Sequence, residues 1–279
     1  MPSRFIVVPE WQGSSSSRSM RLIDGAEAIR GDLPSSATTT VEVPLGAGES
    51  LGTEVARYSS LTAVRERVAD ALRAVPADHV PLVIGGDCGV ELAAVEHALR
   101  AAPDLAVVWL DAHADLNLPG ASPSGAFHGM VARALLGQGA EGLVADPALD
   151  PGRLVLAGVR ACDPPEDAFI AEAGVPMVSP AALEDPAALV AAVEATGATA
   201  VYVHVDLDVL DPEDIVGVAA PEPFGVRVPA LTAAIRALRE RFPLVGAGIT
   251  EFAPASPADA RTDLPAVLRV LSALTARVG

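Results

Sequence analysis

Short runs of apolar residues, many of them β-branched, alternate along the chain with segments whose apolar residues recur at helical spacing. The runs are apolar throughout rather than alternating with polar residues, which is typical of strands buried on both faces. The pattern predicts eight strands, at Phe5–Val8, Val41–Leu45, Leu82–Ile84, Ala106–Leu110, Leu154–Ala157, Pro176–Val178, Val201–Val205 and Val245–Ile249. It predicts helices near Met20–Ile29, Leu61–Ala74, Val90–Arg100, Ala187–Ala195, Leu231–Arg241 and Leu264–Ala276, and another that starts near Pro164.

Repeated strand–helix units predict a single doubly wound α/β domain over residues 1–279, with about eight mainly parallel strands and helices on both faces. A barrel of eight strands and eight helices is the alternative fold, because the same number of strands would satisfy it. We favour the open sheet because the first strand–helix units are irregularly spaced. The Ser14–Ser17 run and the Gly/Pro-rich stretch from Pro119 to Gly125 are expected to be loops over the site.

Composition excludes several classes of protein. Acidic residues outnumber basic ones by 36 to 19, so we expect no nucleic-acid partner. Every basic residue is arginine, which excludes a Schiff-base enzyme and a Walker-A phosphate loop, since both need a lysine amine. The chain has no apolar run of the ~18 to 20 residues that a membrane span needs, and its N-terminus lacks the long apolar core of a signal peptide. A cytoplasmic location is expected, and two cysteines are too few for a disulfide scaffold.

Polar residues gather where four of the predicted strands end. Ligands of open α/β sheets bind at the carboxyl edge of the strands, so we expect these segments to meet in one crevice. They read Gly-Gly-Asp-Cys at 85–88, Asp-Ala-His-Ala-Asp at 111–115, Asp-Leu-Asp-Val-Leu-Asp-Pro at 206–212 and Thr-Glu at 250–251.

Carboxylates together with an imidazole make a hard oxygen and nitrogen site, which suits Mn²⁺ or Mg²⁺. Asp111 and Asp206 could each bridge two ions, with His113, Asp115 and Asp208 filling the other positions. Two ions that lie ~3.5 to 4 Å apart can share a water molecule and lower its pKa, which makes a hydroxide nucleophile near neutral pH. The expected chemistry is attack on an unreactive, resonance-stabilised carbon.

The sequence resembles the arginase (ureohydrolase) family over nearly its whole length. That family's signatures run GGDH, DAHxD, SGxxHG, SxDxDxxDP and a late Glu, and here they read GGDC, DAHAD, SGAFHG, HVDLDVLDP and TEFAP in the same order. The resemblance implies an α/β sheet of eight mainly parallel strands with two Mn²⁺ per subunit and a guanidino substrate. It implies that His128 is the proton shuttle and that Glu251 faces the guanidinium. The implied metal ligands are Asp111, His113, Asp115, Asp206 and Asp208, with Cys88 where the family has its first ligand histidine.

Within that family, arginases hold the amino-acid end of the substrate through loop residues. Asn117, Ser124 and Asp163 stand at the matching positions, within DAHADLN, SGAFHG and RACDPPE. The resemblance therefore implies hydrolysis of L-arginine or a close derivative to L-ornithine and urea or hydroxyurea. In this reaction Asp115 would accept a hydrogen bond from the attacking hydroxide. A homo-oligomer is possible.

Cys88 leaves other substrates open. The similar hydrolases that act on Nω-hydroxy-L-arginine also carry Cys at this position but lack the shuttle histidine, which is present here as His128. Another guanidino acid is a further alternative, and a catalytically impaired arginine-binding homologue is a remote one. Plainer interpretations are that Cys88 packs as a small hydrophobe and that Asp163 caps the helix near Pro164.

The other histidines and the second cysteine are given structural interpretations. His79 lies before a strand, at the end opposite the predicted site, and His97 lies within a helix. His204 lies in the middle of a strand and points away from the face of Val203 and Val205. Cys162 could approach Cys88, but a disulfide is not expected in a cytosolic chain.

Overall fold

A computed structural model describes residues 1–276 of the chain. Within them, eight parallel strands form a sheet in the order β2-β1-β3-β8-β7-β4-β5-β6. The strands are β1 (Ser3–Val8), β2 (Thr38–Thr40), β3 (Val80–Gly85), β4 (Leu105–Leu110), β5 (Leu154–Ala157), β6 (Met177–Val178), β7 (Ala200–Asp206) and β8 (Leu244–Thr250). The sheet begins at β2 and ends at β6 without closing, so the open α/β fold is confirmed and the barrel alternative is wrong.

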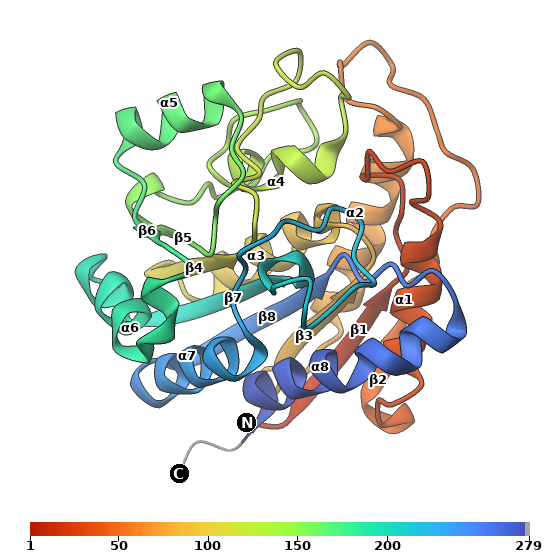
Figure 1. Cartoon of the computed structure of the whole chain (residues 1–279). Coiled ribbons are helices and arrows are strands. Elements are labelled where there is room, and N and C mark those ends of the chain that lie inside the picture. Colours follow the sequence, from red (N-terminus) through yellow and green to blue (C-terminus); the bar gives the residue numbers. More distant parts are fainter. Residues whose placement is uncertain (277–279) are drawn as a thin grey trace.

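Helices cover both faces of this sheet, as Figure 1 shows. One apolar core lies between the sheet and α1, α6, α7 and α8, and the other lies between the opposite face and α2 to α5. The helices are α1 (Arg21–Arg30), α2 (Tyr58–Arg73), α3 (Glu91–Ala101), α4 (Val131–Leu135), α5 (Pro164–Ala173), α6 (Pro186–Ala195), α7 (Val228–Arg241) and α8 (Pro257–Thr275). Every residue of β3, β4 and β7 is buried, which explains why these strands are apolar runs without alternation.

The predicted strand Val41–Leu45 is wrong, because β2 lies at Thr38–Thr40 instead. Three consecutive threonines, which are β-branched, favour extended backbone, and an edge strand tolerates their exposed hydroxyls. Val41 still donates a backbone hydrogen bond to Val7 O at 2.8 Å. Pro44 then lacks an N–H to continue the ladder.

The last helix starts earlier than Leu264, the predicted first residue, since α8 begins at Pro257. Ser256 caps it, because its Oγ accepts a hydrogen bond from the Asp259 N–H at 3.2 Å, and proline is favoured at the first helical position. Pro265 lies inside α8, where proline ordinarily breaks a helix. The predicted start at Leu264 lies one residue before this proline, where a helix more often begins.

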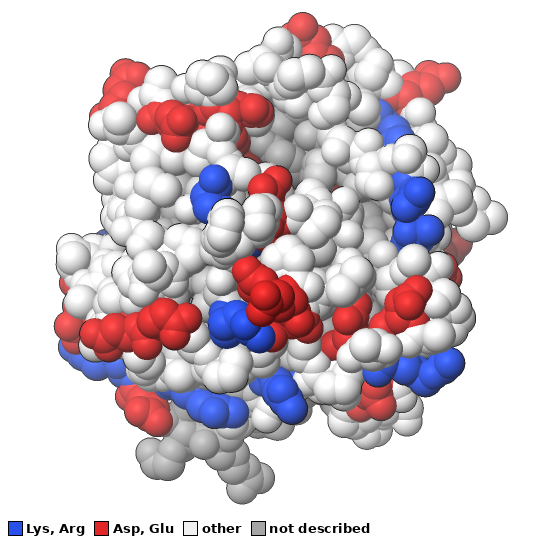
Figure 2. All heavy atoms as spheres, in the orientation of Figure 1, with Lys and Arg blue, Asp and Glu red and all other residues white. Residues whose placement is uncertain are grey.

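The surface agrees with the acidic composition. Figure 2 shows acidic side chains spread over this face of the molecule, interspersed with basic ones rather than separated from a continuous basic patch. Among residues 1–276, the helices are too short or too polar to span a bilayer.

Candidate active site

The four strands that precede the polar motifs are neighbours in the middle of the sheet. Their spatial order is β3, β8, β7, β4, although the chain forms β4 before β7 and β8. Because all four run parallel, their carboxyl ends open on one edge, where the segments that follow them converge (Figure 1). The predicted meeting of the four motifs is confirmed.

Asp111 and His113 follow β4 and are fixed by short hydrogen bonds. The Asp111 carboxylate accepts from the Trp109 Nε1–H at 3.0 Å and from the His113 N–H at 2.7 Å. The His113 Nδ1 lies 3.1 Å from Asp208 Oδ2 and 3.5 Å from Asp111 Oδ1. One imidazole nitrogen therefore faces two carboxylates that come from different strands.

Asp206 and Asp208 stand at the end of β7. The Asp208 N–H donates to Asp206 Oδ1 at 2.8 Å, and the Ala112 N–H donates to Asp208 Oδ1 at 3.1 Å. Each carboxylate therefore has one oxygen held by backbone. Asp206 is 3% exposed and Asp208 2% exposed, so both charges lie almost out of water.

Cys88 follows β3 and reaches the same group of side chains. Its Sγ lies 3.2 Å from Asp206 Oδ2 and 3.4 Å from Thr250 Oγ1. The approach depends on Gly86, where a Cβ would lie 1.6 Å from the Glu10 carbonyl oxygen. Cys88 and Cys162 are both free thiols.

Three sets of side chains in the described part of the chain bring their donor atoms within 4.8 Å of one another, close enough to hold a metal ion. They are Cys88 with Asp111 and His204, Cys88 with Asp206 and Glu251, and Asp111 with His113 and Asp208. Asp111 and Cys88 each belong to two sets, and sharing of this kind is what a bridging carboxylate such as Asp111 needs. Asp206 belongs to one set, so its bridging role stays a prediction. Asp115 is in none of the three sets, and its assignment as a ligand stays a prediction.

The charge of these groups is poorly balanced without a cation. Burial, with repulsion from Asp208 and Asp111, raises the pKa of Asp206 well above its usual range. Burial, with repulsion from Asp111, raises the pKa of Asp208 to about 6. Burial alone would lower the pKa of His113, but hydrogen bonds to Asp111 and Asp208 raise it to about 12. The residues present therefore fit a divalent cation, whose charge would favour the ionised carboxylates.

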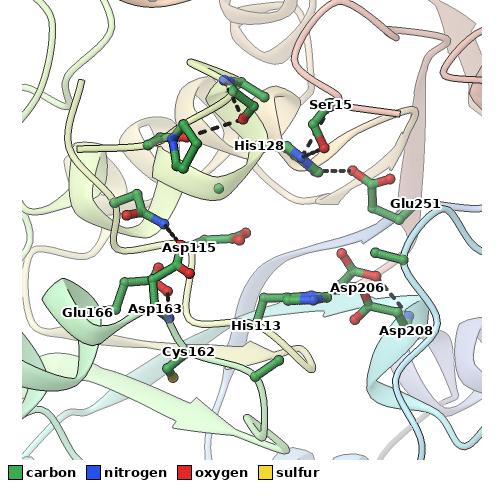
Figure 3. Close-up of a pocket in the computed structure, with 18 residues that line it drawn as sticks. Ser15, His113, Asp115, His128, Cys162, Asp163, Glu166, Asp206, Asp208 and Glu251 are labelled. Carbon is green, nitrogen blue, oxygen red and sulfur yellow. Dashed lines mark hydrogen bonds and ion pairs between the residues drawn. The ribbon is translucent and has the colours of Figure 1, made fainter. Parts of the chain in front are cut away.

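A cavity of about 460 Å³ opens beside these groups (Figure 3). Cys88 and Asp111 lie behind its wall, and Asp111 is fully buried. The wall holds all the other predicted site residues, namely His113, Asp115, Asn117, Ser124, His128, Asp163, Asp206, Asp208 and Glu251. Ser15 and Ser122 also line it, so both segments predicted to be loops over the site contribute to the wall.

Glu251 and His128 are paired at one side of the cavity. His128 Nδ1 lies 3.3 Å from Glu251 Oε1, and His128 Nε2 lies 3.1 Å from Ser15 Oγ (Figure 3). Burial would lower the pKa of His128, but the hydrogen bond and charge of Glu251 outweigh it and raise that pKa above its ordinary value. The imidazole thus connects a buried carboxylate to a loop hydroxyl, a geometry suited to proton transfer.

Two side chains of the cavity sit on strained backbone. Asp115 has φ 53° and Glu251 has φ 63°, in the left-handed region that side chains other than glycine rarely adopt. Such a residue costs about 1–3 kcal/mol unless its surroundings hold it. Glu251 is held by its N–H, which donates to Gly86 O at 2.8 Å. The strain directs both carboxylates into the site.

The residues expected at the amino-acid end of the substrate all line the cavity, and two of them are in contact. Asn117 Nδ2 donates to Asp163 Oδ2 at 3.0 Å. Asp163 is also the N-cap residue of α5, the position in which the alternative interpretation, that it caps this helix, places it. Ser124 lies on an exposed loop, where its Oγ accepts from the Ala126 N–H at 3.2 Å.

Glu166 and Asp87 organise the loops of the site, and the sequence analysis assigned neither of them. Glu166 accepts from the Leu116 N–H and from the Asp163 N–H, each at 2.8 Å, so it joins two cavity loops. Asp87 accepts from the Gly13 N–H at 2.8 Å and holds the loop that carries Ser15. Asp87 lies within the GGDC motif, but only the fold shows what Glu166 contacts.

The comparisons with known proteins agree with this geometry. A profile of the arginase family matches residues 15–275. An arginase from Bacillus caldovelox is 34% identical over 195 residues, which are 64% of this chain and 65% of the relative. An Nω-hydroxy-L-arginine amidinohydrolase from Streptomyces lavendulae is 32% identical over 215 residues, 76% of this chain and 73% of the relative. The solved structure of the B. caldovelox arginase superimposes with a TM-score of 0.85 at 25% identity, over 99% of this chain and 98% of that one.

Proposed function

This chain belongs to the arginase family, a family of hydrolases that act on amidines, and we propose that it hydrolyses the guanidino group of L-arginine or a close derivative. The products are L-ornithine and urea, or hydroxyurea if the guanidino group is hydroxylated. One observation carries the proposal: the carboxylate–imidazole group stands on one side of a cavity whose wall also holds Glu251 and the Asn117–Asp163 pair.

The metal centre belongs to the same proposal. Two Mn²⁺ ions per subunit are the expected cofactors, with Asp111, His113, Asp206 and Asp208 among their ligands, since carboxylate oxygens and imidazole suit this ion. The sharing of Asp111 between two sets of donor atoms supports a pair of ions rather than one. When bound, the ions would activate a water molecule for attack on the guanidinium carbon.

The residues of the chain then bind the substrate and move its protons. Glu251 accepts hydrogen bonds from the guanidinium nitrogens through its buried carboxylate, of which Oε2 has no hydrogen-bond partner among the described residues. Asp115 accepts a hydrogen bond from the attacking water, and its Oδ2 likewise has no partner among the described residues. His128 carries protons between the leaving amine and the cavity mouth, because its second ring nitrogen faces Ser15 on a loop.

Nω-Hydroxy-L-arginine is the second candidate substrate, and Cys88 favours it. A thiolate adds negative charge where the family's signature has a neutral imidazole, which makes an activated water harder to ionise. A hydroxyguanidine tolerates the weaker nucleophile better, because more of it is neutral near pH 7. The relative from S. lavendulae, which is named for this substrate, supports the same choice.

The proposal is tested by assaying protein loaded with Mn²⁺ against L-arginine, Nω-hydroxy-L-arginine and agmatine in parallel. We expect ornithine from at least one of the two amino acids and little turnover of agmatine, which lacks the carboxylate. If agmatine is the preferred substrate, the assignment of Asn117, Ser124 and Asp163 is wrong. Two bound ions without turnover of any guanidino compound would identify an impaired arginine binder.

Asp163→Ala is expected to raise KM for the amino-acid substrate by about 10- to 100-fold, because it removes a charge-assisted contact to the α-ammonium group worth about 1.5–3 kcal/mol. The value of kcat should change much less, since the proposal places Asp163 against the α-ammonium group and not against the guanidino group. Steady-state kinetics measure both values. Asp167→Ala, an exposed change on the same helix, is the matched control, and an equal effect there refutes the contact.

His128→Asn is expected to lower kcat by about 10²-fold or more, the usual contribution of a positioned acid or base. Added imidazole should restore part of the loss, and the bound metal should be unchanged, because His128 moves protons and does not bind an ion. His97→Asn is the control, because His97 is a half-buried residue of α3 that does not line the cavity. An unchanged kcat would give His128 a structural role and move the chain toward the hydroxyarginine hydrolases.

A further inference from the structure

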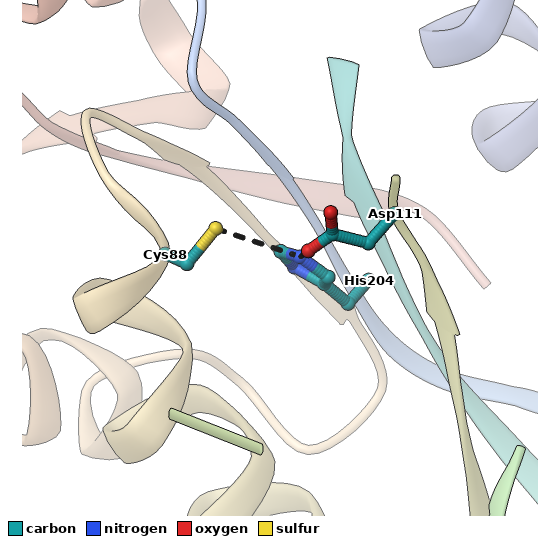
Figure 4. A group of neighbouring side chains, drawn as sticks. All are labelled: Cys88, Asp111 and His204. Atoms are coloured by element: carbon teal, nitrogen blue, oxygen red, sulfur yellow. Dashed lines mark hydrogen bonds and ion pairs between the residues drawn. The ribbon is translucent and has the colours of Figure 1, made fainter. Parts of the chain in front are cut away.

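His204 of β7 lies against Cys88 and Asp111, although the sequence analysis gave it a structural role. Its Nε2 is 3.8 Å from Cys88 Sγ and 4.0 Å from Asp111 Oδ2. Figure 4 shows the three side chains pointing toward one another. His204 and Asp111 are fully buried and Cys88 is 1% exposed. Metal bonds of about 2.0–2.3 Å at tetrahedral angles set donor atoms roughly 3.3–3.8 Å apart. The three atoms therefore stand close to the spacing that one ion requires.

The other side of the His204 ring faces a buried carboxylate. His204 Nδ1 is 3.5 Å from Glu91 Oε2, and the same oxygen accepts a hydrogen bond from the Tyr202 hydroxyl at 2.8 Å. Glu91 is fully buried, and a Cβ at Gly248 would lie 1.9 Å from its Oε1, so glycine makes room for it. A histidine that binds metal through one nitrogen usually donates its other N–H to a carboxylate. His204 Nδ1 has no hydrogen-bond partner among the described residues, and the Glu91 carboxylate is the acidic group that faces it.

The orientation of the ring is fixed by a stacking contact. Trp109 of β4 pairs directly with His204 of β7, and the ring centroids lie 3.6 Å apart with planes 25° from parallel. Trp109 also donates to Asp111, so one side chain positions both the imidazole and the carboxylate. An imidazole held in this way is preorganised to bind an ion rather than free to rotate.

We propose that His204 is a metal ligand, which with Cys88 and Asp111 binds one ion of the centre, and that Glu91 is the positioning residue that orients it. The inference rests on the metal centre of the proposed function. The two departures from the family's signatures support each other, because this chain has Cys88 where GGDH has histidine and has His204 where SxDxDxxDP has serine. This chain therefore supplies an imidazole from strand β7, where the family's signature supplies one from the loop that corresponds to the loop after β3.

The proposal gives the two ion positions different chemistry. One has sulfur, nitrogen and oxygen donors, and the other has only the nitrogen and oxygen donors of His113, Asp111 and Asp208. Thiolate and imidazole select softer divalent ions than carboxylates do. The ratio of Co²⁺ or Zn²⁺ affinity to Mn²⁺ affinity should therefore be higher at the Cys88 position than at a position with imidazole in place of the thiolate.

Co²⁺ titration of protein treated with a chelator tests the proposal without an activity assay. The variants are His204→Ser, the double variant Cys88→His with His204→Ser, and the control His97→Ser. We expect the wild type and the control to bind two Co²⁺ with a thiolate-to-cobalt absorption band. His204→Ser should bind one of them at least 10- to 100-fold more weakly. The double variant should regain the ion without the thiolate band and with a lower ratio of Co²⁺ to Mn²⁺ affinity.

Melting temperatures separate ligation from packing. If His204 only packs, His204→Ser lowers the melting temperature equally with and without metal. If His204 is a ligand, adding metal raises the melting temperature of His204→Ser by less than it raises that of the wild type. If removing the ring prevents folding, the isosteric Glu91→Gln keeps the ring in place and should still weaken the same ion by about 10-fold. Two ions bound by His204→Ser with wild-type affinity and spectrum would overturn the proposal. A wild type that binds no metal would overturn the metal centre itself.

Discussion

Asp111→Asn is expected to abolish the binding of at least one ion and to lower kcat/KM by about 10³-fold or more. The amide keeps the size of the side chain but removes the charge shared by two sets of donor atoms. An activated water and the electrostatic stabilisation that ions provide are together worth several kcal/mol, and each 1.36 kcal/mol is tenfold in rate. The amide has one acceptor oxygen, so it can still accept from only one of the two present donors, the Trp109 Nε1–H or the His113 N–H.

Elemental analysis and steady-state kinetics on the same preparation measure both effects. Asp104→Asn is the matched control, because Asp104 lies just before β4, at the opposite end of that strand from Asp111. Its 69% exposed side chain pairs with Arg153, an interaction worth about 0–1 kcal/mol. If Asp111→Asn keeps two ions with wild-type affinity, Asp111 does not bridge them.

Glu251→Gln is expected to lower kcat/KM by about 10²-fold or more, and metal content is measured on the same preparation because Glu251 shares one set of donor atoms with Cys88 and Asp206. The buried carboxylate is the only charge that the proposal places against the guanidinium, and removing one partner of a buried, hydrogen-bonded charge pair costs about 2–5 kcal/mol. The loss should be larger for L-arginine, a cation, than for Nω-hydroxy-L-arginine, which is neutral to a greater extent.

Glu10→Gln is the matched control for this change. Glu10 and Glu251 are both 2% exposed, but burial and repulsion from Asp87 raise the pKa of Glu10 well above its usual range. Glu10→Gln therefore replaces a carboxyl group whose charged form is already disfavoured by burial and by Asp87. Equal losses in the two variants would mean that Glu251 acts through the structure and not through its charge.

The sequence predicted the sheet and the position of the site because both depend on strong local signals. Apolar runs without alternation marked the central strands, and polar motifs directly after β3, β4, β7 and β8 marked one edge. Edge strand β2 and the start of α8 were misplaced, because threonines at an edge and a proline inside a helix depart from the expected pattern. At β2 the threonines follow β-propensity but not the apolar pattern, whereas Pro265 in α8 departs from helix propensity.

The contacts behind the site needed the fold itself. Glu166 and Glu91 lie in helical segments, and nothing in their sequence neighbourhood shows that one joins two cavity loops and the other faces His204. His204 follows the alternation of β7, but that alternation does not show that β3 delivers Cys88 to the same face. The substrate, the oligomeric state and the cytoplasmic location stay predictions.

Ornithine release measured against the number of ions bound per chain tests the central claim most directly. Protein treated with a chelator is titrated with Mn²⁺, and each sample is divided between elemental analysis and an assay containing both L-arginine and Nω-hydroxy-L-arginine. We predict no release from the metal-free protein and a rise that reaches its plateau when two ions are bound. Full release without metal, or no release at two ions per chain, would contradict a two-metal guanidino hydrolase.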